Sequence, residues 1–112
     1  MKRGELYLIP DDPDDPSGKK RPVVVVSRTD INGGKCVVCV PFYSQQLEKR
    51  RAWRFCAAFS RGEGNLDRDC VAKADQIMTV EKTYLSGAPL GTFNEAQMDR
   101  VTRAIRYTIG DD

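Results

Sequence analysis

Four cysteines, Cys36, Cys39, Cys56 and Cys70, are the residues whose type and spacing first suggest chemistry. Cys36-x-x-Cys39 has the spacing of half a zinc site. It lies, however, in a β-forming run from Cys36 to Phe42, where an offset of three residues sends two side chains to opposite faces of a strand. The sequence contains no histidine that would complete a ligand set. We therefore predict reduced, buried cysteines, with no metal site and no cofactor.

The charged side chains are nearly balanced. The chain has 18 basic and 16 acidic residues and a net charge of +2, so its surface as a whole does not attract polyanions. A nucleic-acid site must be a local basic patch. The densest basic run is Lys49–Arg51, which is typical either of a clamp on nucleic acid or of a solvated hairpin loop.

The length of 112 residues fits one domain that spans residues 1–112. The N-terminal residues lack the layout of a signal peptide, and no stretch approaches the roughly 20 apolar residues that cross a bilayer. We expect a cytoplasmic protein without a membrane segment.

The first half of the chain predicts a hairpin of buried strands. A short strand at Glu5–Ile9 is followed by an acidic, proline-rich loop. Arg21–Ser27 is β-branched without polar alternation, which indicates a central strand covered on both faces. The turn residues of Asp30–Gly34 join it to a second buried strand at Cys36–Phe42.

Strands are also expected in the second half. The segments are Ala52–Phe59, Asp69–Val80 as one or two strands, and Tyr84–Phe93 as turns around a short strand, with a loop at Arg61–Asn65 between the first two. In the first segment Trp53, Phe55 and Ala57 alternate onto one face. This pattern favours Trp53 as a core or dimer-interface residue over a platform for stacking bases.

One helix is predicted at the end of the chain. Asn94 and Gln97 have the spacing of a capping box, and Gly110 is suited to end the helix after about Ile109. Met98, Val101 and Ile105 recur at i, i+3 and i+7. Arg100, Arg103 and Arg106 follow one side and indicate a solvated face. Short strands and one terminal helix predict a mainly β fold, a compact barrel or strongly bent sheet with the helix packed on it.

Several sequence blocks occur in one order along nearly the whole chain. They are Lys2-Arg-Gly-Glu-Leu-Tyr7, Lys20-Arg-Pro-Val-Val-Val-Val-Ser27, Val40-Pro-Phe-Tyr-Ser44, Gly64-Asn-Leu-Asp-Arg-Asp-Cys-Val71 and Asp75-Gln-Ile-Met-Thr-Val80. Their order and spacing resemble those of the MazF/PemK family of toxin endoribonucleases. The resemblance implies an SH3-like small barrel of the PemK/CcdB kind with a C-terminal helix. It also implies a homodimer and the toxin role in a type II toxin–antitoxin system.

The same resemblance implies metal-independent, sequence-selective cleavage of single-stranded RNA by attack of the ribose 2′-hydroxyl. It further implies a cognate antitoxin whose disordered tail occupies the RNA groove. Such cleavage requires a proton acceptor, stabilisation of charge on phosphorus and a proton donor for the 5′-oxygen. Arg21 matches the family's arginine before proline, and its forked donors suit a pentavalent phosphate. The alternative is a solvated arginine or one paired with Asp14 and Asp15.

The main departure from the family pattern is at Tyr43. The family places a hydroxyl residue, usually threonine, two positions after the residue matching Pro41. Here that position holds Tyr43, and Ser44 follows. A phenol places its oxygen several ångströms from that of a threonine. Ser44, slightly preferred as the hydroxyl donor, would face the other side of a strand unless a bulge redirects it.

Lys73 and Asp75 match the basic and acidic positions to which the family assigns acid and base work. Because they are two positions apart on a predicted strand, their side chains share a face. The alternative to a catalytic or RNA-binding role is an ordinary surface ion pair. Gln76 would lie on the opposite face and brace the barrel by hydrogen bonding. The expected RNA contacts are Lys19, Lys20, Lys49, Arg50, Arg51 and Gln76. A competing hypothesis, favoured by Tyr43, is a non-catalytic member of the fold that binds RNA, antitoxin or a protein target such as gyrase.

Overall fold

The computed structural model describes residues 1–15, 17–85 and 87–112; Pro16 of the expected acidic loop and Ser86 of the expected turn segment lie outside the described residues. The strands are β1 Glu5–Pro10, β2 Lys20–Val25, β3 Cys36–Tyr43, β4 Cys56–Phe59, β5 Cys70–Lys73, β6 Met78–Glu81 and β7 Gly91–Thr92. The helices are α1 Leu47–Arg50 and α2 Glu95–Ile109, and short 3-10 turns are η1 Thr29–Ile31, η2 Glu63–Asn65, η3 Ala74–Gln76 and η4 Lys82–Tyr84. No helix within the described ranges is long and apolar enough to cross a membrane.

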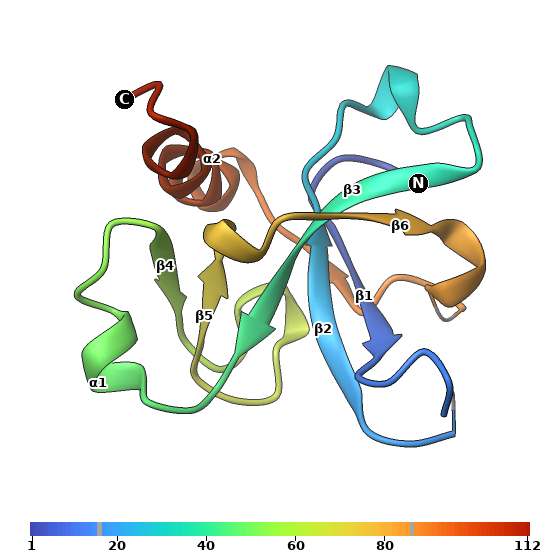
Figure 1. Cartoon of the computed structure of the whole chain (residues 1–112), viewed down its shortest axis with the longest axis horizontal. Coiled ribbons are helices and arrows are strands. Elements are labelled where there is room, and N and C mark those ends of the chain that lie inside the picture. The colour runs from blue at the N-terminus through green and yellow to red at the C-terminus, as the bar shows by residue number, and fades with distance from the viewer. Residues whose placement is uncertain (16, 86) are drawn as a thin grey trace.

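Strand β3 organises the sheet (Figure 1). The strands lie in the order β4-β5-β3-β2-β1-β7 with antiparallel pairing, and β6 also pairs with β3. Residues Cys36–Cys39 of β3 pair with β6, whereas Phe42 and Tyr43 at its end pair with β5. One long strand thus serves two pairings in succession, which bends the sheet. The expected mainly β fold, a small SH3-like barrel or strongly bent sheet with a C-terminal helix, is confirmed in the form of a half-barrel.

The central hairpin is formed by β2 and β3, with Val23 opposite Pro41. Val24 and Val26 enter the cluster beneath α2, whereas Val23 and Val25 enter a second cluster on the other face of the sheet. Because successive strand residues point to opposite faces, a run of valines fills both clusters. The expectation of a central strand covered on both faces is confirmed.

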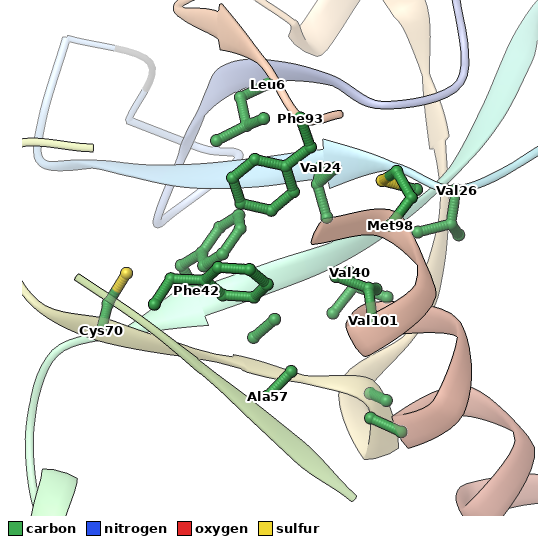
Figure 2. Close-up of a cluster of buried hydrophobic side chains, with 14 of the residues drawn as sticks. Leu6, Val24, Val26, Val40, Phe42, Ala57, Cys70, Phe93, Met98 and Val101 are labelled. Carbon is green, nitrogen blue, oxygen red and sulfur yellow. The ribbon is translucent and has the colours of Figure 1, made fainter. Parts of the chain in front are cut away.

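The larger core lies between the sheet and α2 (Figure 2). The ring centroids of Phe42 are 6.0 Å from Phe59 and 5.9 Å from Phe93, in edge-to-face geometry, and Met98 of α2 belongs to the same cluster. Such aromatic contacts add to the stabilisation from area burial. Phe42 is 2% exposed, so alternation turns the next residue, Tyr43, away from this core.

Helix α2 begins and ends where the sequence predicts. Asn94 Oδ1 accepts from the Gln97 amide at 2.9 Å, and Gln97 Oε1 accepts from the Asn94 amide at 2.8 Å, which completes the capping box. Gly110 ends the helix with φ +76°, a conformation that glycine adopts without steric cost. The residues Met98, Val101 and Ala104 are buried, so the helix is anchored along one side.

The segment before β4 differs from the prediction. Residues 52–55 form turns, and β4 begins only at Cys56. The Trp53 amide donates to Arg50 O and the Cys56 amide donates to Trp53 O, so these backbone groups bond locally instead of in a ladder. Trp53 stacks on Phe55 with centroids 5.0 Å apart. Trp53 is half-buried and belongs to neither core cluster, so the core alternative is wrong, whereas a place in a dimer interface stays a prediction.

The cysteines of the core are inert thiols. Cys39, Cys56 and Cys70 are buried and Cys36 is half-buried, and all four are free. Burial raises the pKa of Cys39 and Cys70 to about 12. The prediction of buried core cysteines is thus confirmed for three of the four, and their thiols stay protonated at neutral pH.

Glu63 supports a prediction about acid stability. Its carboxylate accepts from the Ser60 amide at 2.7 Å, from Gln97 Nε2 at 3.1 Å and from Arg100 Nη1 at 3.3 Å. Burial raises the pKa of Glu63, but these hydrogen bonds and the Arg100 charge together lower this pKa below its usual range. A carboxyl group whose pKa is lower in the folded than in the unfolded protein stabilises the fold at every pH above its unfolded pKa. This stabilisation is lost as the pH falls through the folded-state pKa.

Glu63→Gln is therefore expected to lower the free energy of unfolding near pH 7 by about 1 kcal/mol or less. It should also flatten the loss of stability between about pH 5 and pH 3. Urea unfolding across that pH series measures both effects. An acid limb as steep as that of the unsubstituted protein would show that Glu63 does not link pH to stability.

Candidate active site

A cleft of about 350 Å³ opens beside the start of β2 and the end of β3. Its polar lining residues include the predicted Lys19, Lys20, Arg21, Tyr43 and Ser44, together with Asn65, Asp67 and Arg68 from the η2–β5 connection. The strands β2 and β3 are hydrogen-bonded neighbours, which explains why residues about twenty positions apart meet there. The fold thus gathers most of the predicted catalytic candidates at one concave surface.

Arg21 is held on three sides. Its Nε donates to Asp11 Oδ1 at 2.8 Å, its Nη1 donates to Phe42 O at 3.0 Å, and its guanidinium carbon lies 4.0 Å from the centroid of the Tyr43 ring. Its side chain is 24% exposed. Among the described residues, none accepts a hydrogen bond from Nη2. The guanidinium is therefore preorganised and retains a donor for a ligand in the cleft.

Asp11 is a site residue that sequence reasoning missed. The expected partners of Arg21 were Asp14 and Asp15, but the ion pair is made with Asp11. The β1–β2 ladder explains this choice, because the Asp11 amide continues the pairing by donating to Lys19 O at 2.9 Å. Asp11 directly follows β1, and this register places it diagonally across from Arg21 of β2.

Three cationic side chains contact the ring of Tyr43. Besides Arg21, the Arg50 guanidinium carbon and the Lys73 Nζ each lie 5.2 Å from the ring centroid. Each contact is favourable because the face of the ring carries negative potential. Like charges gathered this closely also repel one another, so the group favours a bound anion. Tyr43 therefore links the cleft to Arg50 and Lys73.

Arg50 has two buried donors that are not paired within the described residues. Its Nε and Nη1 are buried and have no hydrogen-bond partner among the described residues. Buried donors without acceptors destabilise a fold, and they are rarely retained without a function. A phosphate or carboxylate oxygen that reaches these donors after a movement of the Arg50 side chain beside Tyr43 would satisfy them.

Ser44 borders the same cleft as Tyr43. Strand β3 ends at Tyr43, so strand alternation no longer governs the direction of Ser44 and no bulge is required. Within the described part of the chain, neither hydroxyl makes a hydrogen bond. Both remain candidates to donate to a phosphate oxygen.

Lys73 and Asp75 lie together, although not on one strand as expected. Lys73 ends β5 and Asp75 lies in η3. Their Nζ and Oδ2 atoms are 3.9 Å apart, with side chains 15% and 32% exposed. The pair is therefore more enclosed than an ordinary surface ion pair. The 3-10 turn interrupts the chain between β5 and β6, which run in the same direction along β3, and it brings the two groups to the same side.

Gln76 and Cys56 are neighbours of the Lys73–Asp75 pair. Gln76 is exposed and its Nε2 donates to Asp75 Oδ2 at 3.4 Å, so the expected brace inside the barrel is wrong. Cys56 lies opposite Lys73 in the ladder. Burial, and then Asp75, raise the pKa of the Cys56 thiol against the opposing effect of Lys73 and Arg50, which argues against a thiolate nucleophile.

The side chains of the basic run Lys49–Arg51 do not point to one common site. It lies in α1 and the following turn, where successive side chains are rotated by about 100°. Arg50 points to Tyr43, whereas Lys49 lies 5.6 Å from the Trp53 ring centroid and Arg51 lines a different groove. Only Arg50 of this run reaches the candidate active site.

The wall formed by Asn65, Asp67 and Arg68 was not assigned from the sequence, although the block Gly64–Val71 contains all three residues. Asn65 Nδ2 donates to Leu90 O at 2.9 Å. A Cβ on Gly91 would lie 2.1 Å from Gly64 O, so only glycine permits this close approach. The backbone contact fixes η2 against β7 and thereby positions the wall.

Comparisons with known proteins agree with the fold and identify the family. Residues 2–109 match the family model of the PemK-like, MazF-like toxins of type II toxin–antitoxin systems. Among curated proteins no significant sequence match is found.

Similar solved structures come from bacteria. An endoribonuclease in complex with its cognate antitoxin, from a mycobacterial species, superposes with a TM-score of 0.78 at 23% identity over 98% of this chain and 95% of that one. The toxin MazF-mt6 of Mycobacterium tuberculosis gives 0.77 at 19% identity over 96% and 98%. A MazE–MazF complex of Deinococcus radiodurans gives 0.76 at 17% identity over 100% and 97%. The TM-scores establish a shared fold, and the family match extends over nearly the whole chain: the protein belongs to the PemK-like, MazF-like toxins of type II toxin–antitoxin systems.

Proposed function

We propose that this toxin is a metal-independent endoribonuclease that cleaves single-stranded RNA at selected sequences. The observation that carries the proposal is Arg21, which is held rigidly at the cleft by Asp11 and Phe42 O with Nη2 left for a ligand. Similar structures include proteins described as mycobacterial endoribonucleases. A fixed guanidinium suits the negative charge that develops on phosphorus during phosphoryl transfer.

We assign roles to the surrounding groups as part of this proposal. Asp75 accepts the proton of the ribose 2′-hydroxyl, whose oxygen attacks the adjacent phosphorus. Arg21 and a hydroxyl of Ser44 or Tyr43 stabilise the phosphorane oxygens. Lys73 donates a proton to the departing 5′-oxygen, so the products are a 2′,3′-cyclic phosphate and a 5′-hydroxyl. Arg21 and Lys73 contact the same Tyr43 ring, so both lie within reach of one phosphate.

Flanking cations provide the binding surface. Lys19 and Lys20 line the cleft, and Arg50 adds its two buried donors beyond Tyr43. Phosphate contacts of this kind hold a strand without reading its sequence. We assign sequence selection to the wall of Asn65, Asp67 and Arg68, because amide, carboxylate and guanidinium groups pair with the edges of bases.

The biological assembly follows from the same proposal. The residues 1–112 act as one domain in a cytoplasmic homodimer whose RNA groove is blocked by a cognate antitoxin. Similar toxins are described in complexes with their antitoxins, as in the MazE–MazF structures of Deinococcus radiodurans.

Arg50 gives a prediction that separates binding from stability. Arg50→Met should leave the free energy of unfolding unchanged or raise it by about 1 kcal/mol, because it removes two buried donors without acceptors. It should weaken the Kd for RNA by about fivefold to tenfold through the lost charged hydrogen bonds. Chemical unfolding and fluorescence anisotropy measure the two effects.

Arg28→Met is the matched control, because the Arg28 side chain is 79% exposed and lies beyond the other end of β2. A marked loss of stability in Arg50→Met alone would contradict the assignment of Arg50 to binding.

The function is tested by incubating EDTA-treated protein with a long single-stranded RNA and mapping the ends of the fragments. We expect cuts at a recurring short sequence, 2′,3′-cyclic phosphate termini, and no cuts with Arg21→Ala. Intact RNA with retained binding would instead support a non-catalytic member of the fold. Activity that appears only when a divalent cation is restored would refute metal independence.

A further inference from the structure

A second groove, of about 300 Å³, lies between the turn before β4 and helix α2, which are neighbours in Figure 1. Its chemistry-bearing lining residues are Arg51, Arg54, Arg100, Arg103, Trp53 and Tyr107. It shares no lining residue with the candidate active site. The proposed nuclease reaction makes no use of this concentration of arginines.

The groove carries an excess of positive charge. Arg54 pairs with Asp112 at 2.8 Å and Arg100 pairs with Glu63 at 3.3 Å. The contact of Arg51 with Glu48 is long, at 3.8 Å, and the Glu48 side chain is 94% exposed. Arg103 has no ion-pair partner in the described ranges. The guanidinium groups of Arg51 and Arg103 are therefore available to an anionic ligand.

The form of the groove favours carboxylates over nucleotide bases. Trp53 already stacks on Phe55, and the Arg54 guanidinium carbon lies 4.5 Å from the Tyr107 ring centroid. Rings engaged in this way offer little free surface on which a base could stack. A carboxylate, by contrast, is already bound at the groove, since Arg54 Nη2 holds Asp112 Oδ2.

We propose that this arginine groove binds an acidic peptide segment, with its carboxylates on Arg51, Arg54 and Arg103. Guanidinium and carboxylate groups match each other in bidentate geometry. The side chain of Asp112 occupies the position that one ligand carboxylate takes at Arg54. Asp112 is thus an internal competitor, and its carboxylate must leave Arg54 when the peptide binds.

Trp53 provides a direct readout because it is the only tryptophan of the chain and lines the groove. A tryptophan-free oligoglutamate peptide is titrated into the full chain without RNA, and the Trp53 fluorescence is followed. We expect a saturable change that is absent with oligoglutamine of the same length. The Kd should rise when ionic strength is raised from about 0.05 M to about 0.3 M, because salt screens exposed charges.

Variants locate the site. The double variant Arg51→Gln, Arg103→Gln should weaken oligoglutamate binding at least about tenfold, and Asp112→Asn should tighten it about threefold by freeing Arg54. Arg106→Gln is the matched control on the same helix, because Arg106 is exposed and does not line the groove. Equal weakening by Arg106→Gln, or no effect of the double variant, would overturn the proposal by showing general attraction to a basic surface.

Two further measurements separate peptide binding from nucleic-acid binding and from nuclease activity. A single-stranded oligonucleotide that changes Trp53 fluorescence more strongly than oligoglutamate, and loses this effect in the double variant, would reassign the groove to nucleic acid and overturn the proposal. Arg21→Ala, which removes the proposed cleavage, should bind oligoglutamate with unchanged Kd. Peptide binding therefore stands or fails independently of nuclease activity.

Discussion

Replacing Arg21 with alanine should lower kcat/KM for RNA cleavage by about 10²–10³-fold, the loss expected when one preorganised donor to a developing anion is removed. The reason lies in its anchoring. Asp11 and Phe42 O hold the guanidinium, and Tyr43 covers its face. The donor is therefore already oriented before substrate arrives. Single-turnover cleavage of a short RNA that contains the mapped sequence measures the effect.

Arg21→Lys is the matched test of geometry against charge. Lysine retains the positive charge but lacks the planar fork that spans Asp11, the carbonyl and the phosphate. We therefore expect Arg21→Lys to recover only a small part of the lost rate. Recovery to nearly full activity would show that charge alone suffices and would contradict a directed role for Nη2.

Stability must be measured on the same variants, because Arg21 also has structural contacts. Its ion pair with Asp11 is partly exposed, and such pairs contribute up to about 1 kcal/mol. Arg21→Ala should therefore remain folded, with a slightly lower free energy of unfolding. Unfolding of this variant at room temperature would instead assign Arg21 to the structure.

Local patterns predicted the elements whose cause is local. The valine run of β2 fills two clusters because side chains alternate along a strand. The capping box of α2 closes within three residues, at Asn94 and Gln97. Neither feature depends on distant parts of the chain, so both could be read from the sequence.

The features that the sequence did not reveal depend on tertiary register. Asp11 becomes the partner of Arg21 only because the β1–β2 ladder continues past Pro10. The separation of Arg50 from Lys49 depends on α1, which follows Gln46 in a left-handed conformation with φ +55°. A left-handed glutamine is uncommon and carries no composition signal. The basic run therefore looked like a single loop in the sequence, although its side chains reach two separate sites.

The ring and the hydroxyl of Tyr43 have roles in the proposed reaction that substitutions can separate. Its ring is contacted by Arg21, Arg50 and Lys73. Tyr43→Phe preserves this platform and removes only the hydroxyl, so we expect kcat/KM within about threefold of the unsubstituted protein. Tyr43→Ala removes the platform and should lower kcat/KM by about 10–10²-fold, because misplaced catalytic groups lose rate steeply.

Ser44→Ala completes the comparison. Ser44 borders the cleft beside Tyr43, and as the donor to the phosphorane its loss should lower kcat/KM by about tenfold or more without a large change in KM. A loss in Tyr43→Phe as large as that in Ser44→Ala would transfer the donor role to the phenol. Full activity in both would leave charge stabilisation to Arg21 and Lys73 alone.

Tyr43→Thr distinguishes a rearranged site from a weakened one, because the family usually places threonine at the position of Tyr43. A rearranged site should lose activity with threonine, since the three cations lose their common ring. A weakened site should gain activity.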